Sequence, residues 1–100
     1  MLNNGAHYVS AGVREVLGTG IQNLLWLILD HVEIEVESPV QVFTLSIHEK
    51  NRQKIVHTQI PLYRKEFSLL STAPLSATVY VICDGQDKTM MLGNEYQEGK

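Results

Sequence analysis

The sequence predicts an α+β fold: a single antiparallel sheet of about five to six strands, with one amphipathic helix packed on one face. One segment has the period of a helix, while several later segments have the two-residue period of strands and are separated by turn-forming residues. A chain of 100 residues, 44% of them hydrophobic, is long enough for one core. The sequence therefore predicts a single domain over residues 1–100, in which 94–100 form a loose tail.

The first predicted elements are a strand and the helix. Residues 7–13 contain β-branched and alternating positions that favour a strand, although Gly12 weakens it. A turn follows, and Thr19 is a suitable N-cap for a helix over 21–32. The apolar residues of this helix recur at helical spacing and fill one arc, which we expect to pack on the sheet: Ile21, Leu24, Leu25, Ile28, Leu29 and Val32.

Trp26 lies outside this arc, toward the polar side of the predicted helix. We prefer the interpretation that a neighbouring loop or terminus covers the indole. The alternative is that Trp26 anchors a partner or a second copy, because tryptophan is enriched at interface hot spots. Leu27, which lies between the apolar arc and the polar side, favours this alternative slightly. Trp26 is therefore a candidate binding residue.

An acidic stripe follows the helix, where Glu33, Glu35 and Glu37 alternate with apolar residues. In an extended chain these carboxylates line one face and most simply form a solvated, charge-protected edge. Neighbours on one face stand roughly 7 Å apart along a strand, which is too wide for tight chelation of one ion. We predict no metal site and no cofactor.

A hairpin is predicted from strands over 40–48 and 53–60, joined by the four residues EKNR. With that loop, His48 pairs with Gln53 and Thr44 pairs with His57. A loop one residue longer or shorter would turn His57 toward the core, which costs more polar burial. We therefore expect His57 outward. The predicted faces hold Phe43, Leu45, Ile47, Val56 and Ile60 on one side, and Thr44, Ser46, His48, Gln53, His57 and Gln59 on the other.

Two further strand regions complete the predicted sheet. Pro61 ends the preceding strand, and 62–70 continues as another, with Tyr63, Lys65, Phe67 and Leu69 on one face. The most apolar strand, 77–84, is expected at the centre, and a loop at 85–88 leads into a strand at 89–92. In that arrangement Val79, Val81, Cys83, Met90 and Leu92 share a face, so Cys83 is expected to be a small buried core residue.

Charge and cysteine content restrict the class of protein. A net charge of −3 provides no strong positive field for phosphates, so nucleic-acid binding through Lys54, Arg64 and Lys65 is a weak alternative. One cysteine cannot form an internal disulfide, which favours a reducing compartment. The longest apolar run, at 24–29, is about a third of the roughly 20 residues that a membrane span needs, and the N-terminus does not resemble a signal peptide. These features predict a cytoplasmic protein with no membrane association.

Motifs for catalysis are weak in this chain, which contains no G-x-S-x-G elbow, P-loop or dinucleotide fingerprint. We assign no catalytic residue. The sequence favours a non-enzymatic interaction or regulatory module that binds another protein or a second copy of itself. Its candidate binding residues are His57, Gln59, Tyr63 and Trp26. The alternative is a small enzyme with His57 as general base near Asp84 or Tyr63.

Four segments together resemble an uncharacterised family of small Gram-positive bacterial proteins, catalogued as domain of unknown function 960. They are YVSAGV at 8–13, QVFTLS at 41–46, QKIVHTQIPLYRKEF at 53–67 and VICDGQDKTMMLGNEY at 81–96. The resemblance spans nearly the whole chain and implies a compact α+β domain in a bacterial cytoplasm, without an assigned activity. The family pattern has an arginine where this chain has Ala11 and an acidic residue where it has Ile60, so no binding role carries over to those positions.

Overall fold

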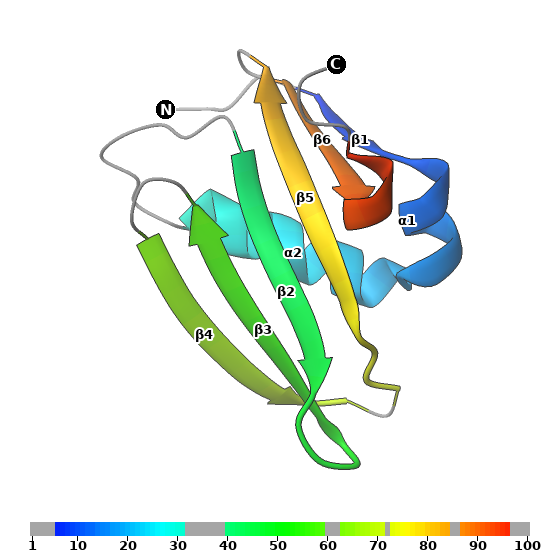
Figure 1. Ribbon diagram of the computed structural model, residues 1–100, viewed down its shortest axis with the longest axis vertical. Helices are drawn as coiled ribbons and strands as arrows, with labels where there is room; N and C mark the ends of the chain where they lie inside the picture. The colour runs from blue at the N-terminus through cyan, green and yellow to red at the C-terminus, as the bar shows by residue number, and fades with distance from the viewer. Residues whose placement is uncertain (1–5, 32–39, 60–62, 72, 85–86, 97–100) are drawn as a thin grey trace.

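The computed structural model describes residues 6–31, 40–59, 63–71, 73–84 and 87–96. Six strands form one sheet in the order β1-β6-β5-β2-β3-β4 (Figure 1). Neighbouring strands are antiparallel except β1 and β6, which are parallel. The predicted α+β class is therefore confirmed, with one parallel pair at the edge of the sheet. The elements are β1 (His7–Val9), α1 (Ala11–Val16), α2 (Thr19–His31), β2 (Val40–Ile47), β3 (Arg52–Gln59), β4 (Tyr63–Leu70), β5 (Ala77–Asp84), β6 (Asp87–Leu92) and the 3-10 helix η1 (Gly93–Glu95).

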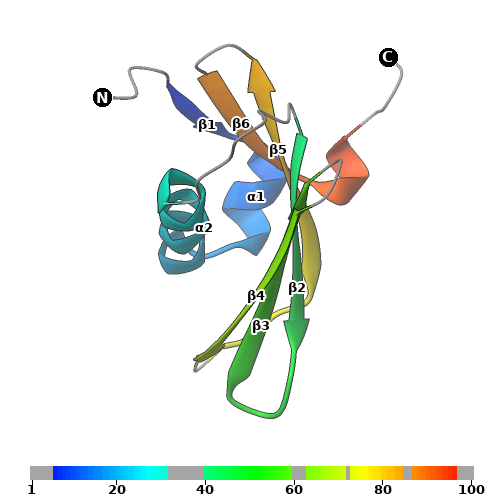
Figure 2. The ribbon, with the colours of Figure 1, turned by 90° about the vertical axis from the view of Figure 1, so that its left-hand side faces the viewer.

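Both α-helices lie on one side of the sheet, whereas η1 lies on the other (Figure 2). The predicted apolar arc of α2 is confirmed, because Leu25, Ile28 and Leu29 are buried and Ile21 and Leu24 pack partly buried against the core. No helix in the described ranges is long and apolar enough to cross a membrane. The buried core joins the two helices to β2, β3, β5 and β6, and it contains Val13, Leu17, Leu25, Ile28, Leu29, Phe43, Leu45, Ile55, Val79, Val81 and Met90.

The start of α2 differs from the prediction. The carbonyl of Gly18 accepts the N–H of Gln22 at 3.1 Å, so the helix already includes Thr19 as its first residue. The predicted arc member Val32 and the acidic stripe at 33–39 lie outside the described residues, as do Ile60 and Pro61.

The predicted strand at 7–13 is wrong beyond Val9. The hydroxyl of Ser10 accepts the N–H of Val13 at 3.2 Å and thereby caps the short helix α1, so the chain turns where a continuing strand was expected. The three residues of β1 form a strand because β6 lies beside them. The N–H of Ser10 continues this pairing by donating to the carbonyl of Met90 at 2.9 Å.

The predicted faces of β3 are also wrong, because the pairing of β2 with β3 is shifted by one residue from the prediction. Ile47 pairs with Gln53, and Phe43 rather than Thr44 lies opposite His57. The N–H of His48 donates to the carbonyl of Arg52 at 2.9 Å, and Glu49 adopts a φ of 118°. A positive φ usually belongs to glycine, so EKNR gives no signal of this turn. As a result Gln53, Ile55 and His57 face the core, while Val56 faces the opposite side.

The remaining strand faces follow the prediction. Phe67 and Leu69 of β4 pack partly buried against the core, and Val79, Val81 and Met90 are fully buried. Asp84 pairs with Asp87, so the loop between β5 and β6 is 85–86 and not 85–88, a change of two residues that leaves the faces unchanged. Cys83 shares the predicted face but is half-buried, so its full burial was predicted wrongly.

Glu95 of η1 connects the C-terminal end of the sheet to the start of α1. Its Oε1 accepts hydrogen bonds from the hydroxyl of Ser10 at 2.6 Å and the N–H of Leu92 at 2.8 Å, while Oε2 accepts the N–H of Gly12 at 3.2 Å. The bonds from Ser10, Leu92 and Gly12 lower the pKa of the Glu95 carboxyl. A Cβ at residue 12 would lie 2.7 Å from Oε2, so a side chain there would displace the carboxylate.

We expect Gly12→Ala to have opposite effects in two backgrounds. In the wild type the new methyl group displaces the Glu95 carboxylate, so the urea midpoint of unfolding falls. In Glu95→Ala the three atoms nearest to the new methyl group are gone, so alanine's helix propensity raises the free energy of unfolding by about 0.5–1 kcal/mol. Urea unfolding of the four chains at neutral pH measures the cycle.

Gly20→Ala is the matched control, because nothing lies within 4 Å of the Cβ it would add to α2. It should stabilise both backgrounds equally. Additive effects of Gly12→Ala and Glu95→Ala would contradict the contact.

The pKa of Glu95 is lowered in the folded state. The contribution of its carboxylate to stability is therefore present above the unfolded pKa and is lost as the pH falls.

Candidate functional site

His57 is fully buried in the core beneath the helices, with 0% of its surface exposed. Its ring stacks on Phe43 with the centroids 4.5 Å apart, and Nε2 lies 2.7 Å from Oε1 of Gln41. An amide oxygen can only accept, so Nε2 carries the proton in this contact. His57 and Gln41 therefore form a neutral polar pair inside an apolar layer.

Burial lowers the pKa of His57 to about 4, because the charged ring would lose its hydration. The imidazole is therefore neutral at physiological pH. The predicted outward position of His57 is wrong, and a buried ring cannot receive a substrate proton or contact a partner in this structure. Asp84, the proposed helper of a His57 base, is exposed at the end of β5, two strands from β3 in the sheet. The hypothesis of a His57–Asp84 enzyme site is therefore wrong.

The other predicted binding residues have different surroundings. Gln59 and Tyr63 pair across β3 and β4, but their side chains lie outside the described part of the structure. Trp26 is partly buried against the core, and the ring of His7 stacks on the indole with centroids 4.1 Å apart and planes 7° apart. The ring of His7, in the N-terminal strand β1, thus covers part of Trp26, in line with the interpretation that a neighbouring loop or terminus covers the indole. A binding role for Gln59, Tyr63 or Trp26 stays a prediction.

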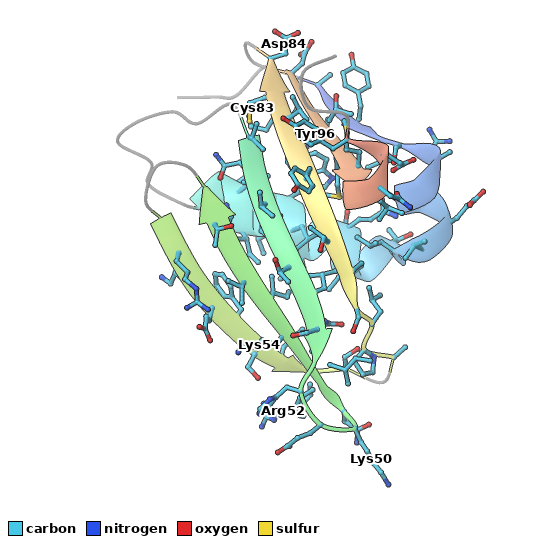
Figure 3. All side chains as sticks on the ribbon, in the orientation of Figure 1. Lys50, Arg52, Lys54, Cys83, Asp84 and Tyr96 are labelled. Carbon is cyan, nitrogen blue, oxygen red and sulfur yellow. The ribbon has the colours of Figure 1, made fainter. Side chains whose placement is uncertain are left out.

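The face of the sheet opposite the helices carries a broad surface of described side chains, which we call the open face (Figure 3). Residues paired across neighbouring strands lie side by side on this face: Val42 lies beside Thr58 and Tyr80, and Thr44 lies beside Val56. The open face consists of Val40, Val42, Thr44, Ser46, Lys54, Val56, Thr58, Arg64, Glu66, Ser68, Thr78, Tyr80, Ile82, Thr89 and Met91.

The C-terminal segment covers one side of the open face. Tyr96 stacks on Tyr80 with ring centroids 4.7 Å apart, and a Cβ at Gly93 would meet Thr78 at 3.3 Å. This packing involves β5 and leaves the surface of β2, β3 and β4 as the less covered part. Exposed Thr44 lies near its centre, beside half-buried Val56.

Charged side chains border this part of the open face. Glu66 forms ion pairs with Arg64 and with Lys54, the second with Nζ 3.5 Å from Oε1. Arg64 foremost, and then Lys54, lowers the pKa of Glu66. Lys65 pairs with His57 in register and therefore lies on the other face, so the three basic residues predicted to bind nucleic acid do not form one patch.

A shallow hollow of about 290 Å³ lies near the charged border, lined by His48, Lys54, Glu66, Phe67 and Ser68. Lys54 marks this region in Figure 3, with Arg52 and Lys50 farther toward the hairpin end. Within the described ranges, no three His, Cys, Asp or Glu side chains are grouped as they would be to hold a metal ion. The residues that line the hollow provide both hydrogen-bonding and charged groups.

These features define a small α+β protein whose mostly antiparallel sheet carries its helices on one face. The chain belongs to the family described as Staphylococcal protein of unknown function (DUF960), whose model matches residues 6–95. Its fold is similar to the crystal structure of a protein of unknown function from Enterococcus faecalis, with a TM-score of 0.76 and 22% identity over 94% of this chain and 92% of that chain. No curated protein matches the chain significantly. The family resemblance is confirmed, and no specific function comes with it.

Proposed function

We propose that this protein is a cytoplasmic, non-enzymatic interaction module that binds another protein through the open face of its sheet. The observation that carries the proposal is the one-sided arrangement of the fold. Helices α1 and α2 cover one face of the sheet (Figure 2), whereas the strand register places Val42, Thr44 and Val56 on the other face. A sheet face that neither α-helix covers is available for contact with a partner.

The chemistry of the open face is suited to protein contact. Val42 and Val56 give it an apolar centre, and Lys54, Arg64 and Glu66 give it a charged border. Protein interfaces commonly combine an apolar centre with a polar rim. Because Glu66 engages both basic side chains, the border keeps a net charge of only +1, which supports a protein partner over a polyanion such as nucleic acid.

Site-specific photo-crosslinking in living bacterial cells tests the proposal. A benzophenone amino acid replaces exposed Thr44 on the open face or, as the matched control, exposed Asn23 on α2. We expect a covalent adduct with one particular protein from position 44 and none from position 23. Adding Val56→Lys should abolish the adduct, because a charge would enter the apolar centre.

The same adduct from both positions, or from position 23 alone, would contradict binding through the open face. The absence of any adduct from position 44 would contradict it as well. Circular dichroism of the Val56→Lys chain must show an intact fold, and Thr58→Lys at the neighbouring half-buried position gives a second charged variant of the same face.

A further inference from the structure

Strand β4 is the last strand of the sheet, and no described segment pairs with its outer side. It is eight residues long, whereas β1 at the opposite edge has three. A long free edge presents a row of unpaired backbone donors and acceptors, which can pair with another chain. We propose that β4 is a dimerisation edge whose partner is the β4 strand of a second copy of this chain, antiparallel and centred on Phe67.

The pairing with β3 determines which backbone groups of β4 point outward. The N–H of Ser71 donates to the carbonyl of Asn51 at 2.8 Å, and hydrogen-bonded positions alternate along an antiparallel pair. The odd-numbered residues of β4 therefore bond to β3. The N–H and carbonyl groups at the outer edge belong to Arg64, Glu66, Ser68 and Leu70.

The distribution of charge along β4 favours a second copy in antiparallel orientation. The charged residues Arg64, Lys65 and Glu66 occupy the first half of the strand, and the second half, 67–70, is uncharged. Pairing about Phe67 places Arg64 opposite Leu70 and Glu66 opposite Ser68 of the other copy. No like charges then lie directly opposite one another. Pairing about Lys65 or Glu66 would instead place that charged residue opposite the same residue of the other copy.

Apolar exposure at this edge supports the same register. Leu70 is 72% exposed, the highest value among the exposed large hydrophobic side chains of the described residues. In the proposed pair, the methylene stem of the other copy's Arg64 covers Leu70. Phe67 lies partly buried at the end of the core, and its symmetry mate would extend that apolar layer on the helix side.

The dimer concerns a surface separate from the centre of the open face, so it goes beyond the proposed function. Residues directly opposite in an antiparallel pair project to the same face of the joined sheet. The helices of both copies would therefore lie on one side and both open faces on the other. A partner of the open face would then meet two copies of the binding surface side by side.

Disulfide trapping of the purified protein tests the register. In a Cys83→Ala background, Phe67→Cys places two thiols at a pair without hydrogen bonds, where Cα atoms approach to about 4.5 Å and a disulfide can form. Leu69→Cys is the matched control, because symmetry-related residues there would be about 13 Å apart. We expect rapid formation of a covalent dimer from the first variant and at least tenfold slower formation from the second.

Light scattering after size exclusion supplies an independent readout without cysteine. We expect the wild type to be a dimer at high concentration, and Leu70→Lys and Ser68→Pro to be monomers. Proline at residue 68 removes an outward N–H and leaves the bonds to β3 in place. Leu27→Lys, which alters another exposed leucine on α2, should remain dimeric.

Three outcomes would overturn the inference: a monomeric wild type at all concentrations, equal trapping at residues 67 and 69, or a dimer that only Leu27→Lys dissociates. Protection of the β4 edge amides from hydrogen exchange by a foreign extended peptide, with the protein alone monomeric, would also overturn it. These measurements use the purified chain alone. Their failure is therefore separate from failure of crosslinking at residue 44.

Discussion

Replacement of Gln53 by alanine is expected to lower the free energy of unfolding by about 3 kcal/mol. The side chain is 1% exposed, and its amide makes two bonds to the backbone of Leu75: Oε1 accepts the N–H at 2.8 Å and Nε2 donates to the carbonyl at 2.9 Å. The carbonyls of Ser46 at 2.9 Å and Lys54 at 3.2 Å also accept from Nε2, so its two N–H groups are shared among three carbonyls. Gln53 thus attaches the connection between β4 and β5 to the sheet, and its loss leaves half-buried backbone groups without these bonds.

Urea unfolding at neutral pH measures the effect. Gln22→Ala is the matched control, because the half-buried Gln22 amide donates one hydrogen bond, to the carbonyl of Leu17 at 2.7 Å. Its loss should cost about 1 kcal/mol. Gln53→Glu keeps an acceptor for Leu75 but removes the donors and buries a charge, so it should be at least as damaging as alanine. Equal losses in Gln53→Ala and Gln22→Ala would show that the Leu75 contacts contribute little.

The fold class was predictable because its main elements have strong local periodicity. The apolar arc of α2 identifies the helix and its buried side, and β5 spans Ala77–Asp84 as predicted. The apolar residues of these segments lie on one side only, or fill the whole segment. Whether each is a helix or a strand, and which side faces the core, therefore does not depend on a loop. Pairing between the two ends of the chain, as in β1 with β6 and Ser10 with Glu95, leaves no such local pattern.

The orientation of β3 was not predictable by the same reasoning. One phase of the strand contains Ile55 among polar residues, and the other contains Val56, so alternation hardly distinguishes the faces. The choice then depended on the loop, where Glu49 has a positive φ and the pairing is shifted by one residue from the prediction. A one-residue change of register moves every side chain of a strand to the other face.

A signal for a buried polar pair was nevertheless present in β2. Gln41 has the same phase as Phe43 and Leu45, which places an amide on the core side of a central strand. A buried amide needs a hydrogen-bond partner from a neighbouring strand, and His57 provides it. Considering β2 and β3 together would have favoured the inward position of His57, whereas the burial cost of His57 alone favoured the outward one.

The buried His57 should make the protein less stable in mild acid. Its pKa is lowered from 6.5 to about 4 in the folded state, so the unfolded chain binds a proton between these values and the folded chain does not. Stability from the neutral ring is fully present above pH 6.5 and is lost as the pH falls toward 4. The loss amounts to about 3 kcal/mol over that window, with about 2 kcal/mol of it between pH 6.5 and 5.

Urea unfolding at a series of pH values tests this expectation with His57→Gln, which removes the titrating ring but can still bond to Gln41. The variant should be less stable than the wild type at neutral pH, because the stacking on Phe43 is lost. Its stability should change little between pH 6.5 and 5, because the ring that titrates in this range is gone and the pKa values of Glu66 and Glu95 are lowered, away from this range. His48→Gln, at an exposed position, should keep the wild-type slope. If the free energy of unfolding changes equally with pH in the wild type and in His57→Gln, another group causes the acid sensitivity. A smaller change in His57→Gln would show that the buried ring of His57 causes it.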